Sequence, residues 1–159
     1  MKKLRKLLQL SSGERRLLAK TALWLAAVRL MLWVLPFRSQ RSLLARLERP
    51  TARELENDPL LPERIAWAVE LASRYIPRAS CLTQSVAAKI LLHRAGYAAE
   101  LHLGVGKDDN GQFQAHAWVE SGERVLIGGR QLEQYALLYT FDGLKTATPR
   151  SLARVKPGS

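Results

Sequence analysis

The hydrophobic pattern of the chain changes its period after residue 96. Before that point apolar residues recur every four positions, at Leu82, Val86 and Ile90, which is typical of one face of a helix. Ser80 is a suitable N-cap and Gly96 a suitable left-handed stop, so we predict a helix over residues 81–95.

Beyond residue 98 apolar and polar positions alternate, which predicts half-buried strands. The first strand places one set of side chains on its apolar face: Ala99, Leu101, Leu103 and Val105. A turn ending in Asn110-Gly111 follows, since Asn-Gly is a strong hairpin signal. The second strand carries a further apolar set: Phe113, Ala115, Ala117 and Val119. A turn at Ser121-Gly122 then leads to a third strand over residues 124–127, giving an antiparallel meander packed against the helix.

The N-terminal part of the chain is predicted to be helical. An apolar run over residues 21–36 predicts a helix from Glu14 to about Leu35, ended by Pro36. The helix is apolar almost all round, so we expect a core or a partner to cover it. The run is shorter than the roughly 20 apolar residues of a spanning helix and lacks a cleavage site, so we expect no membrane span and no signal peptide.

The remaining pattern predicts shorter elements and the domain organisation. We expect a helix over residues 39–47, a capping box at Thr51–Glu54, a linker over residues 57–62 and a helix from Glu63 to Ile76. Together these elements predict one α+β domain. Its divisions are a basic helical part over residues 1–56, a core over residues 57–150 and a flexible tail over residues 151–159.

Positive charge is concentrated at the N-terminal end. The net charge of the chain is +11, and residues 1–50 hold twelve Lys and Arg against two acids, a net +10. This asymmetry fits an acidic peptide, a membrane surface or nucleic acid as partner, or a solvated basic face. The chain has no zinc-finger, RNP, basic-zipper or phosphate-loop pattern, so we expect no nucleic-acid binding. The single cysteine leaves no internal disulfide and fits a reducing, cytoplasmic location.

Cys81 is the first candidate catalytic residue, because it lies in the first turn of the predicted helix. Unpaired N–H groups and the positive end of the helix dipole favour the thiolate there. The same N–H groups could hold the oxyanion of a tetrahedral intermediate. The competing interpretation is a buried cysteine that packs in the core.

His116 is the second candidate. Alternation places it opposite the apolar side of its strand, on the face shared with Gln114, Trp118 and Glu120. A cysteine and a histidine on facing elements form the pair of a thiol acyl-transfer enzyme. His93 and His102 match no zinc-ligand spacing with a single thiol available, so we expect neither metal nor cofactor.

The cysteine and histidine segments resemble a known family. Ser80-Cys-Leu-Thr-Gln-Ser-Val-Ala87 and Ala115-His-Ala-Trp-Val-Glu120, with Gly96–Val105 between them, are similar to the transglutaminase-like leader peptidase of lasso-peptide biosynthesis. The resemblance implies a papain-like, transglutaminase-type core with Cys81 as nucleophile and His116 as general base. It also implies removal of the leader from a ribosomally made precursor, together with a separate leader-recognition protein and a macrolactam-forming cyclase. Trp118 and Gln84 are candidate substrate-binding residues.

The sequence departs from this family at the third catalytic position. The family has an aspartate about a dozen residues beyond the histidine, where this chain has Gly128. With Ser121-Gly122 as the turn, His116 would pair with Ile127. The site is then a dyad, or its imidazole is oriented by a backbone carbonyl, by Glu120 or by Asp142. A degenerate adaptor and an acyl transferase that uses an amine in place of water remain alternatives.

Overall fold

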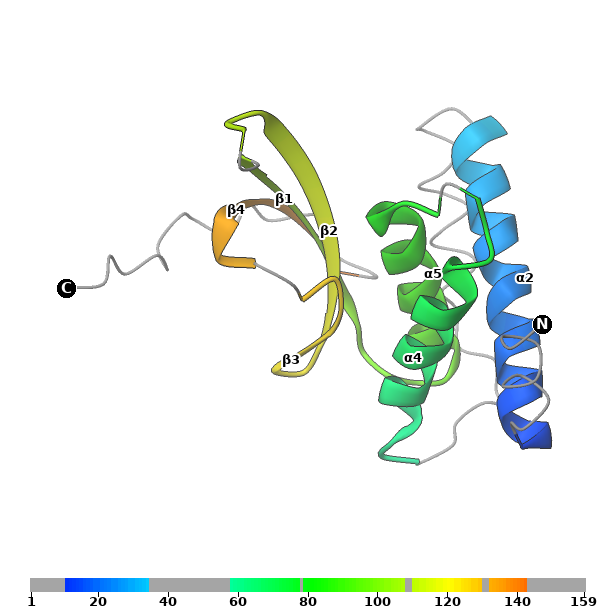
Figure 1. Ribbon diagram of the computed structural model, residues 1–159. Coiled ribbons are helices and arrows are strands. Elements are labelled where there is room, and N and C mark those ends of the chain that lie inside the picture. The colour runs from blue at the N-terminus through cyan, green and yellow to red at the C-terminus, as the bar shows by residue number, and fades with distance from the viewer. Residues whose placement is uncertain (1–10, 35–57, 78, 108–109, 130–131, 143–159) are drawn as a thin grey trace.

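The computed structural model describes residues 11–34, 58–77, 79–107, 110–129 and 132–142. These residues form helices α2 (Ser12–Val34), α4 (Leu61–Ser73) and α5 (Cys81–Arg94), and a four-stranded antiparallel sheet. Figure 1 shows α2 as the outermost element, α4 and α5 in the middle, and the sheet on the other side. The predicted α+β fold, with the cysteine helix packed on the sheet, is confirmed.

Helix α5 has the predicted limits because its own sequence supplies both caps. The Ser80 side chain accepts a hydrogen bond from the Thr83 backbone N–H at 3.3 Å. At the other end Gly96 takes φ +87°, a left-handed conformation that glycine adopts without a Cβ penalty. Most of the helix between these caps is buried, including Val86 and Ile90. Local signals alone therefore define the element that carries the cysteine.

The sheet has the strand order β3-β2-β1-β4. Its members are β1 (Glu100–Lys107), β2 (Phe113–Ser121), β3 (Arg124–Ile127) and β4 (Tyr135–Asp142). The first three form the predicted meander, and Gly111 at the end of the first turn takes φ +77°. β4 was not predicted from the sequence. It follows a short 3₁₀ helix (Leu132–Gln134) and returns to pair with β1, so its place depends on a contact distant in sequence.

The predicted register between β2 and β3 was wrong. The turn residues are Gly122 and Glu123, with Gly122 at φ +62°, so Ser121 pairs with Arg124. A register shift follows, and Ile127 pairs with Val119 instead of His116. The extra residue in β3 is a bulge, which bends the strand and changes what its end faces. The observed register of β3 determines which backbone group lies near the His116 ring.

The apolar face of β2 is buried along only part of its length. Ala117 and Val119 lie in the core, whereas Phe113 is 79% exposed and Ala115 is also exposed. The sequence pattern had placed all four on the covered face. The reason for the difference is the length of α5, which contacts β2 at Ala117 through Ser85 and begins only one turn before Ser85, at Cys81.

Helix α2 begins earlier than predicted and has two different faces. One face packs on α4 and α5 through Leu25, Val28 and Met31. With 23 residues, α2 is long and apolar enough to cross a membrane by length and composition, which corrects our estimate that the segment is too short. The helix predicted over residues 39–47, the capping box at 51–54 and the tail over 151–159 lie outside the described residues.

The core lies between the helices and the inner face of the sheet. Its main contributors are Leu25 and Val28 of α2, Ile65 and Val69 of α4, Val86 and Ile90 of α5, and Leu101 and Val119 of the sheet. Helix α4 starts at Leu61, two residues before the predicted start, with Pro62 in its first turn. Pro is accepted there because its missing N–H has no intrahelical partner.

Candidate functional site

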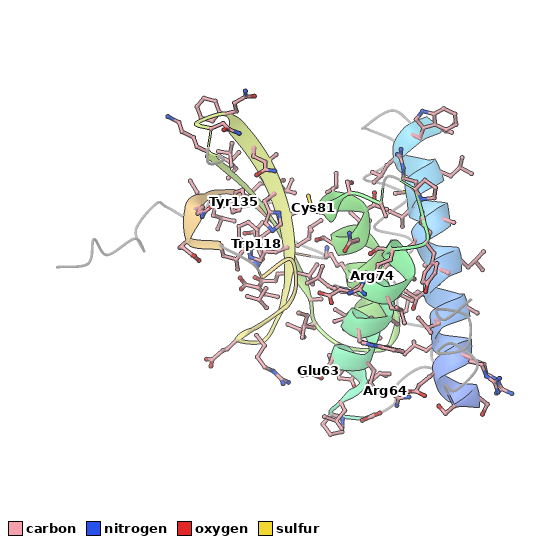
Figure 2. All side chains as sticks on the ribbon, in the orientation of Figure 1. Glu63, Arg64, Arg74, Cys81, Trp118 and Tyr135 are labelled. Atoms are coloured by element: carbon pink, nitrogen blue, oxygen red, sulfur yellow. The ribbon has the colours of Figure 1, made fainter. Side chains whose placement is uncertain are left out.

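Cys81 is the first residue of α5 and is half-buried. The first N–H groups of a helix lack acceptors within the helix. In α5 the Thr83 N–H is taken by the Ser80 hydroxyl and the Gln84 N–H by the Ser80 carbonyl, at 3.0 Å. The N–H groups of Cys81 and Leu82 are therefore the two that the cap leaves for another acceptor. Figure 2 shows Cys81 at this end of α5, on the side of β2.

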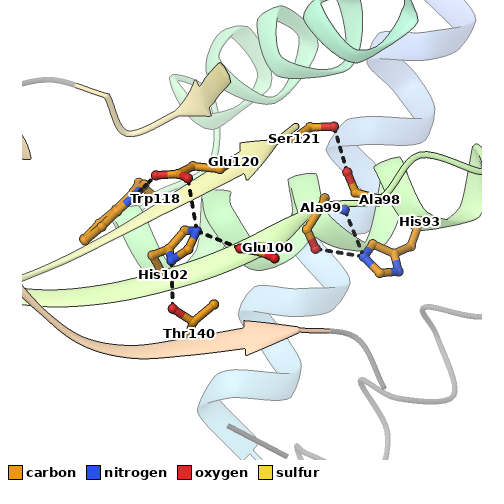
Figure 3. Close-up of polar contacts among 9 residues, drawn as sticks. All are labelled: His93, Ala98, Ala99, Glu100, His102, Trp118, Glu120, Ser121 and Thr140. Carbon is orange, nitrogen blue, oxygen red and sulfur yellow. Dashed lines mark hydrogen bonds and ion pairs between the residues drawn. The ribbon is translucent and has the colours of Figure 1, made fainter. Parts of the chain in front are cut away.

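Two hydrogen bonds establish that α5 and β2 run in the same direction. Near the start of α5, the Ser85 hydroxyl donates to the Ala117 carbonyl at 3.1 Å. Just after its end, the Ser121 hydroxyl donates to the Ala98 carbonyl at 2.7 Å (Figure 3). Cys81 precedes Ser85 by one helical turn and His116 immediately precedes Ala117. The backbones of Cys81 and His116 therefore lie at the same end of the α5–β2 pair. The His116 ring lies on the face of β2 that also carries Trp118, and no hydrogen bond joins the Cys81 and His116 side chains in the described structure.

A backbone carbonyl orients the His116 ring. The Nε2 atom lies 2.7 Å from the carbonyl oxygen of Gly128, and a carbonyl can only accept a hydrogen bond. The proton of the neutral ring is therefore on Nε2, and Nδ1 carries the lone pair that can take a proton. Gly128 is the position at which the resemblance placed a missing acid. Its carbonyl makes the contact to the imidazole.

The Glu120 carboxylate is engaged elsewhere, and the backbone of Asp142 pairs at a distance along β1 from that of His116. The Glu120 carboxylate accepts a hydrogen bond from Trp118 Nε1 at 2.9 Å, and its other oxygen lies 3.5 Å from His102 Nε2. The backbone of Asp142 pairs with Glu100, whereas that of His116 pairs with Gly104, four residues along β1. Among the three orienting groups left open by the sequence, the carbonyl is therefore the one that the structure supports.

Glycine is required at position 128 for two reasons. Its φ is +75°, and a Cβ there would lie 2.6 Å from the Ala117 carbonyl oxygen and 3.0 Å from Trp118 Cβ. A Cβ never approaches a carbonyl oxygen so closely without displacing it. The close approach of this backbone to β2 is what brings the Gly128 carbonyl within reach of the imidazole.

Aromatic rings hold the imidazole on both sides. His116 stacks on Tyr135 with ring centroids 4.7 Å apart and on Trp118 with centroids 6.2 Å apart. Trp118 is 6% exposed and lies over Gly104, where a Cβ would come within 2.9 Å of the indole. The Tyr135 hydroxyl donates to the Gln114 side chain at 3.1 Å. The ring of His116 is therefore fixed in position by packing as well as by its hydrogen bond.

A second histidine extends this stack. His102 is 4% exposed and stacks on the other side of Trp118, with centroids 5.4 Å apart. Its Nδ1 is 3.0 Å from the Thr140 hydroxyl, and its Nε2 faces the carboxylates of Glu100 and Glu120 (Figure 3). The face of the sheet predicted to be polar is thus partly buried, because Trp118 covers β1.

The remaining predicted residues have local roles in the structure. The Gln84 side chain donates to the Ala79 carbonyl at 3.1 Å, which closes the turn before Cys81. His93 Nε2 lies 2.9 Å from the Ala99 carbonyl, at the far end of α5. In the described part of the chain no three His, Cys, Asp or Glu side chains gather as a metal site.

The contributions of Tyr135 and Ser85 were not predicted from the sequence. Tyr135 lies nineteen positions after His116 on a strand without a clear alternating pattern, so no local signal connects the two. Ser85 is one of several polar residues in α5, so its type alone did not indicate the hydrogen bond to Ala117.

The comparisons with known proteins agree with this geometry. A family model described as "Transglutaminase-like superfamily" matches residues 22–140, from within α2 to within β4. No curated protein and no solved structure matches the chain significantly. The matched region is about three-quarters of the chain and includes the cysteine helix, the whole meander and the Gly128 carbonyl, and the chain belongs to the transglutaminase-like superfamily.

Proposed function

We propose that this protein is a cysteine peptidase that removes the leader from a ribosomally made lasso precursor peptide before ring closure. The observation that supports the thiol chemistry is the His116–Gly128 contact, at the end of the α5–β2 pair where α5 begins with Cys81. The superfamily supports a papain-like cysteine peptidase or acyl transferase. Leader removal rests on the resemblance of the cysteine and histidine segments to lasso leader peptidases.

In the proposed reaction, His116 Nδ1 takes the proton of the Cys81 thiol, and the sulfur attacks the scissile carbonyl carbon. The N–H groups of Cys81 and Leu82 stabilise the oxyanion that forms. The imidazolium then protonates the leaving amine, the C–N bond breaks and a thioester remains. Water, deprotonated by Nδ1, attacks the thioester, releases the new carboxyl end and restores the thiol. The Gly128 carbonyl keeps Nε2 protonated throughout these steps.

The substrate and the partners follow from the same proposal. The precursor leader peptide would be presented by a separate leader-recognition protein, and the product would pass to a cyclase that closes the macrolactam. The net +10 of residues 1–50 supports an acidic surface on one of these partners. If the affinity for such a partner stays flat from about 50 to about 300 mM salt, charge does not drive that contact.

An acyl transferase is the second candidate, because the superfamily includes this chemistry and the same thioester can be opened by an amine. The two reactions differ in their products. Incubation of the precursor with the protein and an added primary amine separates them by mass. Hydrolysis gives a free carboxyl end at the cleavage site, whereas transfer leaves the amine attached there.

The first experiment measures the Cys81–His116 pair without a substrate. We expect iodoacetamide to alkylate Cys81 rapidly at about pH 6, well below the pH at which an unassisted thiol reacts. His116→Ala should abolish this reactivity. His93→Ala is the matched control, because it removes the imidazole at the opposite end of α5 and should leave the profile unchanged.

Two outcomes would contradict the proposal. Alkylation that rises only near pH 8.5 in both the native protein and His116→Ala would identify Cys81 as a packing residue and favour the adaptor. If Cys81 is alkylated rapidly at about pH 6 but the protein cleaves no precursor peptide, the Cys81–His116 pair is supported and the peptidase function is contradicted. For a true peptidase, Cys81→Ser and His116→Ala should each reduce cleavage by at least about a hundredfold.

A further inference from the structure

The outer face of α2 is apolar and exposed. The four large side chains on it are Leu23, Leu30, Trp33 and Val34, with exposed fractions from 58% to 78%. Ala19, Ala26 and Ala27 lie between them and are exposed as well. A core helix normally turns its large apolar residues inward, and α2 already does so on its opposite face with Leu25 and Val28. The outer face is therefore a second apolar surface, which the fold itself does not use.

The charges around this surface are positive. Arg15 and Arg16 are exposed at the N-terminal end of α2, and Lys20 and Arg29 lie at the two edges of the apolar stripe. The one acid of the helix, Glu14, is engaged with the Ser11 hydroxyl and N–H at 2.8 Å. An occupant of this face would therefore meet basic side chains at one end and along both edges.

This charge pattern argues against a second copy of the chain. The exposed positions 19, 23, 26, 30 and 33 have the spacing of a coiled-coil seam, so two copies could align their stripes. The charged residues at the positions that flank such a seam, Lys20 and Arg29, would then be basic on both helices, with no acid among the flanking positions to pair with them. The surface of an anionic membrane fits both the apolar stripe and the basic residues around it. The apolar side chains can insert into the membrane interface, and the negative headgroups neutralise the basic side chains.

We propose that the outer face of α2 binds the surface of an anionic membrane, with the helix lying parallel to that surface. Leu23, Leu30 and Val34 insert into the boundary between headgroups and acyl chains. Trp33 lies at the interface, where its amphipathic ring is favoured. Arg15 and Arg16 contact anionic headgroups. Figure 1 shows that α2 is the outermost helix, so the sheet would face away from the bilayer. This proposal does not depend on the peptidase activity.

The test measures sedimentation of the full chain with vesicles of phosphatidylcholine alone or with about 30% phosphatidylglycerol. We expect strong binding to the mixed vesicles, weak binding to the neutral ones, and a loss of binding between about 50 and about 300 mM salt. Leu23→Ser combined with Leu30→Ser should reduce binding to mixed vesicles by at least about tenfold. Both positions are exposed, so the variant should retain its far-UV circular dichroism.

The matched control is Leu138→Ser, which removes a leucine of similar exposure, 61%, from β4 on the other side of the molecule. It should bind vesicles as the native chain does. Trp33→Phe should bind with less than about a threefold change and lose most of the blue shift of tryptophan fluorescence on binding.

Three results would overturn the proposal. The first is absence of binding to mixed vesicles. The second is binding that the double variant does not weaken, which would assign it to other basic residues. The third is a dimer, measured by light scattering, that the Leu23→Ser and Leu30→Ser changes convert to monomer, which would identify this face as an interface between copies.

Discussion

The two halves of the candidate site are held in place by different kinds of contact. Cys81 is positioned by its neighbours in sequence, since Ser80 caps the helix that begins with the cysteine. His116 is positioned by groups that lie twelve and nineteen residues away, the Gly128 carbonyl and the Tyr135 ring. The thiol therefore depends on a local helix signal, and the imidazole depends on how three strands meet.

This difference has consequences for mutations. A cap that is lost costs the helix about 1 kcal/mol and leaves its axis in place. Loss of a contact between strands can turn the imidazole of His116 away from the Gly128 carbonyl. The hydrogen bond and the ring contacts of His116 all depend on the same arrangement of strands. Substitutions around His116 should therefore have larger effects than substitutions around Cys81 that leave the sulfur itself unchanged.

The largest effect is expected from Gly128→Ala. The added Cβ combines a left-handed φ with a collision against the Ala117 carbonyl, so we expect a loss of about 2–4 kcal/mol in the free energy of unfolding. The alkylation of Cys81 should approach that of His116→Ala. Urea unfolding and the alkylation profile measure the two effects.

Gly122→Ala is the matched control for Gly128→Ala. Gly122 also has a positive φ, but a Cβ there meets no atom within 4 Å. It should therefore cost only the conformational strain of about 1 kcal/mol and leave alkylation unchanged. Equal effects of the two substitutions on stability and alkylation would refute the role that we assign to the Gly128 backbone.

A smaller effect is expected from Gly104→Ala, which acts on His116 through Trp118. The new Cβ would lie 2.9 Å from the indole and 3.0 Å from the Ala136 carbonyl, so the ring must shift. We expect a loss of about 1–3 kcal/mol, as for other overpacked sites, together with slower Cys81 alkylation at low pH. A stability loss with unchanged alkylation would show that Trp118 supports the sheet and not the imidazole.

Features that depend on neighbouring residues were predicted from the sequence, and features that depend on contacts distant in sequence were not. The limits of α5, its Ser80 cap and the Gly96 stop were predicted because each signal lies within a few residues of its effect. The third strand was also predicted, but its register was not. The bulge at Leu126 shifts Ile127 to Val119, and nothing in the four residues of β3 indicates this shift. Strand β4 was missed because its pairing with β1 is its main determinant.

The orienting group of His116 shows the limit of motif reading. The sequence shows no acid at the expected position, and a carbonyl oxygen is present at every residue, so no sequence pattern reveals that Gly128 supplies one. The glycine itself was the available signal, because it permits both the positive φ and the close approach to Ala117. A glycine at the place of a missing polar residue can therefore indicate that the backbone contributes the missing contact.

A still smaller effect is expected from Ser80→Ala, which removes the local support of Cys81. Loss of the bond to the Thr83 N–H should cost about 1 kcal/mol in stability, and Ser80→Asp should restore most of it. The rate of Cys81 alkylation should change by less than about threefold, since the remaining helix still begins at the cysteine. A change in the alkylation rate as large as that caused by His116→Ala would contradict the view that the position of Cys81 is less sensitive to substitution than that of His116.

The smallest effect concerns a cap far from the site, at the start of α2. The Ser11 hydroxyl and then its backbone N–H donate to the Glu14 carboxylate and lower its pKa below 4.5, against a small opposing effect of desolvation and with a minor contribution from Arg64. Because the pKa is lowered in the folded state, the stabilisation is complete above pH 4.5 and is lost as the pH falls through the lowered value. Glu14→Gln should therefore unfold at slightly lower urea than the native chain at pH 7, and the difference should shrink as the pH is lowered through the reduced pKa of Glu14. Alkylation of Cys81 should be the same in both proteins. A difference that stays constant with pH would attribute the effect to packing of the Glu14 side chain instead of its charge.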